Sequence, residues 1–302
     1  MAMAGTARAE EQAPAARESR KWRALARTAR QNPLGVAGFL IVAGFIFLGV
    51  FGPYLAPHDP RGIDVTAQLQ GASLAHPFGT NSLGQDMLSR VIAGARISLL
   101  IGLATVGIGV AGGAVLGVVS GYSGGIVDSA IQRLSEAGAA FPGLLFYMVL
   151  IAAIGRGVET IVIGVAVFAV IGGSRVLRSL TVMMRDSPFT EAARAAGATE
   201  LRILVTHIVP NVIPIIIVVA SGAFGAAVLA EAALSFLGIG LEPGTPSWGV
   251  DLSGENLTFA ANGKWHLVAF PGGALSLVVL GFNLLGDTMR DILDPRLRGG
   301  LR

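Results

Sequence analysis

The sequence predicts an all-α integral membrane protein with six transmembrane helices. Of its 302 residues, 53% are hydrophobic and only 14% are charged, and the mean hydropathy is +0.67. A soluble domain carries about 25% charged residues, so this chain lacks the charge that covers a water-facing surface. Its apolar residues gather into six runs, each long enough to cross a hydrocarbon layer about 30 Å thick. Because these runs lack the alternation of barrel strands, helices are the expected spanning elements.

The six apolar runs set the boundaries of the predicted spans. In chain order they cover residues 34–55, 97–120, 126–154, 158–176, 209–238 and 267–286. The third run is the least uniform, because Asp128, Arg133 and Glu136 precede a break at Phe141-Pro142-Gly143 and a clean apolar stretch follows. Residues 34–302 therefore form the predicted membrane domain.

Residues 1–33 precede the first span and form a polar, Ala-rich and basic tail. Seven Lys and Arg residues face three Glu residues there. No apolar run stands at signal-peptide distance, so we expect a retained cytoplasmic tail. Trp22 with its flanking arginines favours an amphipathic helix on anionic lipid, and a flexible tail is equally compatible with the composition.

The distribution of positive charge predicts the orientation of the spans. If the N-terminus is cytoplasmic, 17 of the 22 Lys and Arg residues lie on the cytoplasmic side. The opposite side then holds only five, namely Arg61, Arg90, Arg96, Arg156 and Lys264. This asymmetry follows the positive-inside rule and, with six crossings, predicts that both termini are cytoplasmic. It also accounts for the basic pI of 9.8 without a nucleic-acid partner.

Motifs of catalysis and nucleotide binding are missing from the sequence. There is no cysteine, and the four histidines, at positions 58, 76, 207 and 266, stand at no metal-ligand spacing. The two lysines do not belong to a phosphate-binding Gly-x-x-x-x-Gly-Lys-Ser/Thr loop. We therefore expect a non-catalytic chain without a metal or cofactor site, and any ATP and Mg²⁺ would be bound by another polypeptide.

Two features inside the predicted spans point to packing or to a transport path. Glycine recurs every fourth residue in the second span, at Gly109, Gly113, Gly117 and Gly121. Such a stripe allows close approach of a second helix, which we prefer to a substrate-lining face. Glu231 is an ionisable residue within an apolar stretch near the outer end of the fifth span. Such a residue lines a translocation path or makes a structural hydrogen bond, and the sequence leaves both open.

The inner loop over about residues 177–208 holds the most informative segment. The Ala-rich residues 187–200 predict a short cytoplasmic helix, with Thr190 as N-cap, Glu191 at the positive helix end and Gly197 at the stop. Small side chains on its surface suit insertion into a groove of a partner, although a solvated surface helix is the simpler physical expectation.

A resemblance favours the partner-binding interpretation. Glu191-Ala192-Ala193, then Gly197, then His207-Ile208-Val209-Pro210 is similar to the EAA signature of ABC importer permeases. The resemblance implies a type I ABC importer transmembrane domain whose cytoplasmic loop forms the coupling helix that docks on an ATPase subunit. The residues that it assigns to this coupling are Thr190, Glu191, Ala192, Ala193, Arg194, Gly197, His207 and Pro210.

Further stretches resemble the dipeptide and oligopeptide permeases of the DppC/OppC type. They include His76-Pro77-Phe78-Gly79-Thr80, Gly94-Ala95-Arg96-Ile97-Ser98-Leu99, Pro246-Ser247-Trp248-Gly249 and Phe282-Asn283-Leu284-Leu285-Gly286-Asp287. The resemblance covers nearly everything after residue 32. Val170 and Gly173 depart from the aromatic residues usual in that branch, and Phe189-Thr190 and Val209 are smaller departures beside the motif.

The resemblance implies one membrane subunit of an ATP-driven importer in the bacterial cytoplasmic (inner) membrane. Its expected partners are a second permease of the DppB/OppB type, two ATPase subunits and an extracytoplasmic peptide-binding protein, which would meet the loop after His76 and the acidic loop over Glu242–Glu255. The expected cargo is dipeptides or oligopeptides, with nickel chelates or glutathione as alternatives. A self-sufficient secondary transporter is the alternative of a different class, but no inverted repeat supports it.

Overall fold

The computed structural model describes residues 32–293, and this part of the chain is built of helices and connecting loops. The helical elements are α2 (Pro33–Leu55), α3 (Met87–Ser123), α4 (Gly125–Ala140), α5 (Gly143–Ile154), α6 (Val158–Arg185), α7 (Pro188–Ala195), α8 (Glu200–Ile203), the π-helical turn η1 (Leu204–Ile208), α9 (Val209–Phe236), α10 (Trp248–Asp251), α11 (Gly254–Ala261) and α12 (His266–Leu293). Apart from its last two residues, the basic tail predicted over 1–33 lies outside the described residues.

Five helical segments of the described chain are long and apolar enough to cross a membrane. They are α2, α3, α6, the continuous helix formed by α8, η1 and α9, and α12. The pair α4 and α5 passes the same test together and brings the number to six. The prediction of an all-α membrane protein is confirmed, and three of the boundary differences involve prolines or paired charges.

The first difference is the third predicted span, which is two helices bent by 88°. α4 ends at Ala140, Phe141 takes an extended conformation with φ −77° and ψ 128°, and α5 begins after Pro142. Proline disfavours the helical conformation in the residue before it and has no N–H for the helical ladder. The break that the sequence carries within 126–154 therefore becomes a sharp change of direction.

The other two differences are that α3 and α6 extend beyond their apolar runs. α3 begins at Met87 rather than at residue 97, and α6 continues to Arg185 rather than ending at residue 176. Hydropathy excluded these turns because they carry arginines. The structure gives those arginines partners, since Arg90 pairs with Asp251 at 2.7 Å and Arg178 pairs with Asp128 at 2.5 Å.

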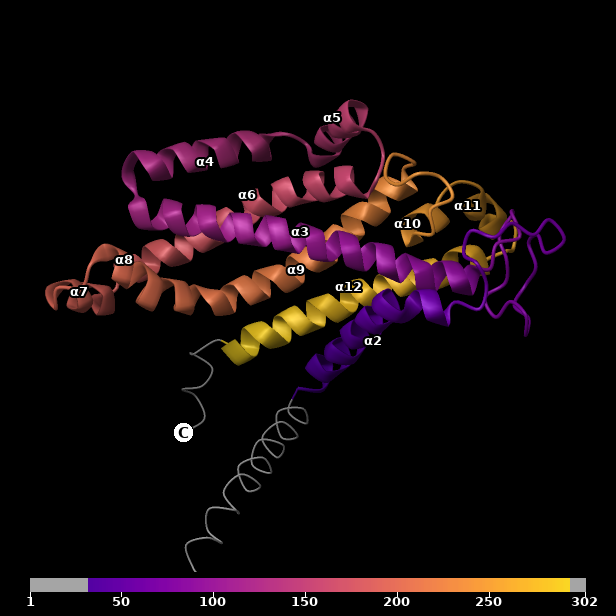
Figure 1. The fold of residues 1–302 in the computed structure, drawn as a ribbon, viewed down its shortest axis with the longest axis horizontal. Helices are drawn as coiled ribbons and strands as arrows, with labels where there is room; N and C mark the ends of the chain where they lie inside the picture. Colours follow the sequence, from indigo (N-terminus) through magenta and orange to yellow (C-terminus); the bar gives the residue numbers. More distant parts are fainter. Residues whose placement is uncertain (1–31, 294–302) are drawn as a thin grey trace, which may run out of the picture.

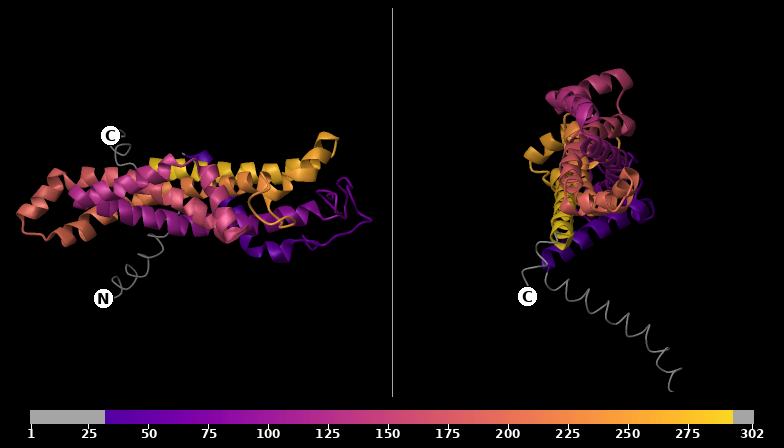
Figure 2. Two further views of the ribbon diagram at one scale, coloured as in Figure 1. Left: turned by 90° about the horizontal axis from the view of Figure 1, so that it is seen from above. Right: turned by 90° about the vertical axis from the view of Figure 1, so that its left-hand side faces the viewer.

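The long helices run roughly along one axis and leave polar structure at both ends (Figures 1 and 2). One end holds the loop over residues 56–86 together with α10 and α11, and the opposite end holds α7 and α8 (Figure 1). α3 runs between the two ends, so it connects the region of the long loop to the region of α7.

An aromatic cluster joins α2, α9, α10 and α12. The rings of Phe224 and Phe282 stack with centroids 4.0 Å apart, and Phe45 lies edge-on to both at 6.0 and 6.1 Å. Trp248 of α10 completes the cluster at 5.9 Å from Phe45 and donates its indole N–H to the carbonyl of Val91. Edge-to-face and offset-stacked pairs of this kind each add about 0.5–1.5 kcal/mol beyond the area they bury.

The glycine stripe of α3 lies against α6 at backbone distance. A Cβ placed on Gly109 would come within 2.5 Å of the Ala169 Cβ, and one on Gly117 within 2.6 Å of the Ser174 carbonyl oxygen. Gly113 and Gly121 meet α6 in the same way, with backbone atoms of α6 at 3.1 and 2.7 Å. Since these neighbours are largely backbone, the two helix axes must separate before any side chain fits.

We expect Gly117→Leu to destabilise the α3–α6 pair. Overfilling a packed contact costs typically about 1–3 kcal/mol, and here the rigid backbone of α6 is the obstacle. Gly107→Leu is the matched control, because Gly107 lies on the same helix and a Cβ there meets nothing within 4 Å. Thermal unfolding of the purified chain in detergent measures the effect. A melting temperature of Gly117→Leu equal to that of the control would contradict this packing role.

Candidate functional site

The helix predicted in the inner loop is α7, and it lies with α8 at one extreme end of the molecule (Figures 1 and 2). It follows the last residue of α6 after a two-residue turn, and α8 leads through η1 into α9. Any displacement of α7 is therefore passed directly to two of the long helices.

The start of α7 is fixed to the end of α6 by two hydroxyl groups. Ser187 is the N-cap, and its hydroxyl accepts from the backbone N–H of Thr190 and donates to the carbonyl of Met184 at 2.7 Å. The buried Thr190 donates to the same carbonyl at 2.8 Å. The prediction that Thr190 caps the helix is wrong by one turn, because Pro188 suits the first helical position and places the cap at Ser187.

The end of α7 is a Schellman turn at Gly197. The N–H of Ala198 bonds to the carbonyl of Ala193 at 3.1 Å, and the N–H of Gly197 to the carbonyl of Arg194 at 2.9 Å. Gly197 has a φ of +84°, which side-chain-bearing residues adopt only at a cost. Ala193 and Ala198 pack on the apolar cluster of Leu177, Ile203, Ile208 and Val212. The turn thus ends the helix and attaches it to α6 and α9.

A polar network ties α7 to α8 and to the end of α3. Arg194 donates to both carboxylate oxygens of Glu200, at 2.9 and 3.3 Å, and the Tyr122 hydroxyl of α3 donates to the Glu200 carbonyl at 3.0 Å. Arg185 donates to the carbonyl of Gly121 at 3.1 Å and pairs with Asp186, which lowers the pKa of the Asp186 carboxyl. Each exposed pair stabilises little alone, but together they order this end.

A π-helical turn with a proline beyond it separates α8 from α9. Pro210 has no N–H for the carbonyl of Thr206, so the regular ladder is broken at this point. The carbonyl of His207, inside the π turn, accepts from the Asn211 side chain at 2.6 Å, and the His207 ring meets Phe189 edge-on at 4.9 Å. Such turns concentrate at functional sites and supply local adjustability. His207 is thereby brought against Phe189 of α7, while Pro210 stands in the first turn of α9.

The outward face of α7 combines small, charged and apolar side chains. Glu191, Ala192 and Arg194 are exposed in the described structure. Around them Phe189 is 57% exposed and Leu201 is 70% exposed. A hollow of about 240 Å³ opens beside the helix, lined by Met184, Ser187, Phe189, Thr190, His207, Ile208 and Asn211. This surface offers a projecting helix and an apolar rim, which suit contact with another protein rather than chemistry on a small molecule.

Glu231 lies in α9 near the opposite end and is fully buried. Its Oε1 accepts from the hydroxyls of Ser247 at 2.6 Å and Ser235 at 3.0 Å, and its Oε2 has no hydrogen-bond partner. Ser247 immediately precedes α10, so the carboxylate joins that short helix to α9. The hydrogen bonds of Oε1 are those of a structural contact between α9 and the start of α10. Oε2 remains able to accept one more hydrogen bond.

Arg90 and Asp251 form a buried ion pair that sequence analysis did not single out. The Arg90 guanidinium, 2% exposed, donates to Asp251 Oδ1 at 2.7 Å and to the Gln85 side chain at 2.9 Å. It also donates to the carbonyls of Pro60 and Thr245 at 3.1 and 3.3 Å. Burial raises the pKa of Asp251, and the guanidinium opposes that rise. The pair fastens both outer loops to the start of α3.

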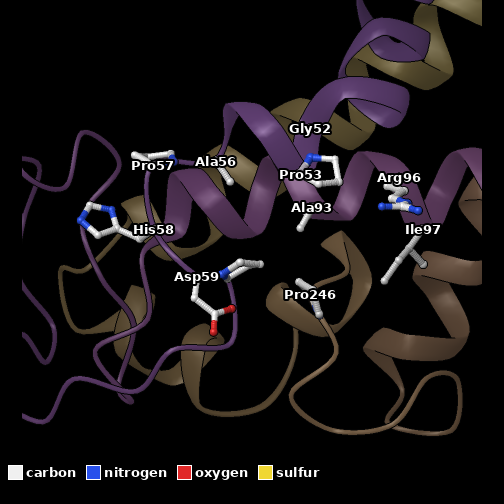
Figure 3. A pocket seen from close by; sticks show the side chains of 11 residues that line it. Gly52, Pro53, Ala56, Pro57, His58, Asp59, Ala93, Arg96, Ile97 and Pro246 are labelled. Carbon is white, nitrogen blue, oxygen red and sulfur yellow. The ribbon is translucent and has the colours of Figure 1, made fainter.

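A second hollow, of about 550 Å³, lies between the end of α2 and the first turns of α3 (Figure 3). Gly52, Pro53, Ala56, Pro57, His58, Asp59, Pro60, Ala93, Arg96, Ile97 and Pro246 line it. Figure 3 shows His58 and Arg96 towards opposite sides of this hollow. Apolar and charged side chains line this hollow together. It lies at the end of the molecule that holds the loop over residues 56–86, opposite α7.

Two family models together match most of the chain, with residues 78–112 between the two matches. Residues 113–299 match the model described as binding-protein-dependent transport system inner membrane component. Residues 21–77 match the N-terminal transmembrane domain of oligopeptide transport permease C. The first match covers α7 and the surface described above.

Curated relatives agree with both family matches. The dipeptide transport system permease protein DppC of Alkalihalophilus pseudofirmus is 37% identical over 277 residues, which cover 92% of this chain and 90% of that protein. The glutathione transport system permease protein GsiD of Escherichia coli is 37% identical over 279 residues, covering 92% and 91%. The GsiD protein of Shigella boydii matches to the same extent. The chain therefore belongs to the binding-protein-dependent inner membrane components, the membrane domains of type I ABC importers, in the DppC/OppC branch of permeases.

Proposed function

We propose that this chain is the permease subunit of an ATP-driven importer of dipeptides or oligopeptides, coupled to its ATPase subunits through α7. One observation supports the coupling proposal: hydrogen bonds hold α7 at both of its ends, while its outer face is exposed. Family membership and the permease relatives support the transport function. ATP and Mg²⁺ bind the partner ATPases, and this chain hydrolyses nothing.

In this proposal the mechanical route runs from α7 into α6 and α9. Thr190 attaches the helix to the last turn of α6, and Gly197 with Ala198 attaches it to the apolar cluster shared by α6 and α9. Closure of the ATPase dimer displaces α7, and the π turn before Pro210 absorbs part of the change in α9. Shifting a two-state transporter from 1:99 to 99:1 needs about 5.5 kcal/mol of differential binding, so a firm attachment is required.

The proposed orientation places the α7 end in the cytoplasm. Arg175, Arg178, Arg185, Arg194 and Arg202 all lie along the segment that leads to and from α7. The positive-inside rule then places this end, and both termini, in the cytoplasm of a bacterial cell with the chain in its inner membrane. The loop over residues 56–86, α10 and α11 face outwards, where an extracytoplasmic binding protein would deliver the cargo.

The remaining partners follow from the same proposal. A second permease of the DppB/OppB type completes the translocation path, and two ATPase subunits dock on the two coupling helices. A short peptide is the cargo that the relatives favour, since one is described as a dipeptide and another as a glutathione permease. Glutathione is itself a short peptide, and a nickel chelate is the remaining alternative. The ligand bound by the partner receptor distinguishes these cargoes.

Co-purification tests the importer proposal against a self-sufficient transporter. We expect an affinity-tagged chain, expressed with its neighbouring transport genes, to retain a second permease and an ATPase through size-exclusion chromatography in mild detergent. ATP hydrolysis by this complex should rise on addition of the loaded binding protein. Transport by the chain alone in proteoliposomes, without ATP, would overturn the proposal.

We expect Glu191→Lys to uncouple ATP hydrolysis from the loaded binding protein. The substitution reverses an exposed charge on the outer face of α7, so assembly of the helices is unaffected while docking is weakened. Stimulation of ATPase activity in the purified complex should fall by about 10-fold, which is 1.4 kcal/mol of lost docking energy. Glu159→Lys, an exposed reversal at the far end of α6, is the matched control. Equal stimulation in both variants contradicts coupling through this face.

We expect Thr190→Val to loosen α7 without removing it. The variant keeps the shape of the side chain but removes one of three donors to the Met184 carbonyl, which keeps the hydroxyl and N–H of Ser187, so the loss is that of one hydrogen bond, about 0.5–1.5 kcal/mol. Hydrogen exchange of the α7 amides should accelerate by about 2- to 10-fold. Thr206→Val removes an exposed hydroxyl of the same type and serves as control. Unchanged exchange in Thr190→Val would show that this anchor is dispensable.

A further inference from the structure

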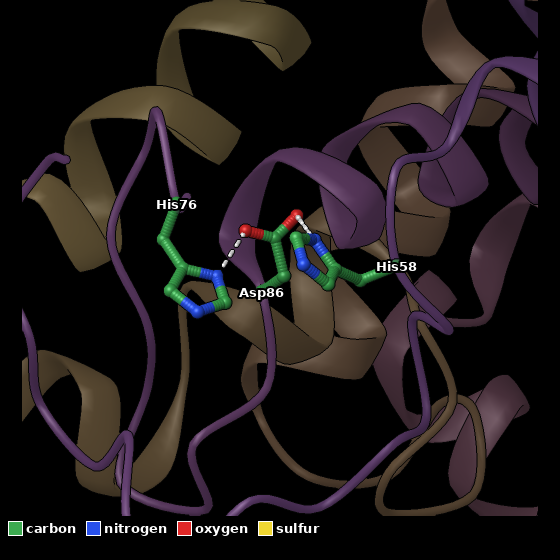
Figure 4. A group of neighbouring side chains, drawn as sticks. All are labelled: His58, His76 and Asp86. Carbon is green, nitrogen blue, oxygen red and sulfur yellow. Dashed lines mark hydrogen bonds and ion pairs between the residues drawn. The ribbon is translucent and has the colours of Figure 1, made fainter. Parts of the chain in front are cut away.

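Three side chains with metal-binding atoms converge where α2 ends and α3 begins. His58 follows α2, His76 comes from the loop over residues 56–86, and Asp86 is the N-cap of α3. The carboxylate of Asp86 lies between the two imidazoles (Figure 4). Nδ1 of His76 is 3.0 Å from Asp86 Oδ1, and Nδ1 of His58 is 3.8 Å from Asp86 Oδ2. One potential ligand atom from each residue lies within 4.8 Å of the other two.

We propose that His58, His76 and Asp86 bind one borderline divalent transition-metal ion, of which Zn²⁺ is the representative. Zinc takes imidazole nitrogen and carboxylate oxygen at about 2.0–2.2 Å, so its tetrahedral ligand atoms stand about 3.4 Å apart. His76 Nδ1 approaches one Asp86 oxygen at 3.0 Å and His58 Nδ1 the other at 3.8 Å, and the three ligand atoms lie within 4.8 Å of one another, so binding of one ion requires the His58 ring to move closer to the other two ligands. The set leaves a fourth position for water.

The chemistry of binding is an exchange of a hydrogen bond for coordination. Both imidazoles must present Nδ1 as a lone pair, so coordination requires the tautomer of His76 that carries its proton on Nε2, and the metal replaces the contact between His76 Nδ1 and Asp86 Oδ1. Asp86 is 2% exposed, and a buried carboxylate is costly without a compensating charge. Its partners in the structure are imidazoles and the N–H and hydroxyl of Ser89, so a cation supplies charge that these groups lack.

Surrounding hydrogen bonds already orient all three residues. Ser89 donates its backbone N–H and its hydroxyl to Asp86 Oδ2, at 2.8 and 2.7 Å. The same hydroxyl accepts from the backbone N–H of His58 at 3.0 Å. The backbone of His76 is held on both sides by Ser73, with bonds of 3.0 and 2.9 Å. Such outer contacts are what orient the ligands in protein metal sites.

The ligand atoms of the proposed site favour a transition metal over Mg²⁺ or Ca²⁺, and the site is accessible from solvent. Two nitrogen donors and one carboxylate suit zinc, whereas the hard cations require six or more oxygen ligands. The His58 side chain is 43% exposed and also lines the hollow of about 550 Å³ described above, which provides an entry path (Figure 3). A bound ion would fasten the end of α2 and the long loop to the first turn of α3.

Zinc titration of the full chain tests the proposal. The chain is purified with its partner subunits, freed of its affinity tag, stripped with a chelator that is then dialysed away, and titrated with ZnCl₂ against a chromophoric competitor. We expect one high-affinity zinc per copy of this chain, an increase in melting temperature on binding, and no displacement by excess Mg²⁺.

Two ligand variants and two controls make the test specific. His58→Ala and His76→Ala should weaken zinc binding by at least the 10- to 100-fold that loss of an outer contact costs. His58→Ala is the decisive variant, because its half-exposed ring lies 3.8 Å from Asp86, beyond hydrogen-bond distance, and its removal leaves the contacts of Asp86 with His76 and Ser89 in place. Glu242→Gln, an exposed carboxylate outside the lining of the hollow beside His58, and His207→Ala, a histidine at the opposite end, should bind zinc as the parent does. Equal affinity in the parent and His58→Ala, or no stoichiometric zinc in the parent, overturns the site and leaves a hydrogen-bonded His–Asp pair.

Discussion

The backbone contact between α3 and α6 is the interaction on which the rest of the structure depends. Four glycines at every fourth position let the helices meet without intervening side chains, so their relative position is set by main-chain atoms. Hydrophobic burial gives helices no reason to associate within lipid, and close packing of this kind supplies the attraction instead. α6 leads into α7, and Asp86 and Arg90 stand at the start of α3, so the same contact fixes the surface around α7 relative to the loop over residues 56–86.

In the described chain, the ion pairs that join different elements lie towards the two ends of this helix pair. At one end Arg194, Glu200 and Tyr122 order the short helices around α7. At the other end Arg90 and Asp251 join the start of α3 to α10. Between them the spans satisfy their backbone groups internally, as an apolar environment requires. The ends are therefore free to specialise in partner contacts while the middle stays a packed bundle.

Much of this organisation follows from local sequence. Hydropathy located the spans, the glycine spacing indicated a packing face, and Ala-rich sequence before Gly197 indicated α7. The outer polar structure was not accessible in this way, because its contacts join residues far apart in the chain. Sequence alone marks Arg90 as a positive charge but does not indicate its partner Asp251. The spacing of His58 and His76 does not show that the two residues converge. A threonine before Ala-rich sequence indicates a cap at Thr190, whereas Pro188 in the first turn places the cap at Ser187.

The distance in sequence between Arg90 and Asp251 has a consequence for how the protein is made. The two residues are 161 positions apart, so α3 leaves the ribosome well before its counterion exists. An unpaired guanidinium is expensive to bury, so the first turn of α3 stays hydrated until α10 is in place. The end of the molecule that holds Arg90 is therefore completed only by residues from the last third of the chain.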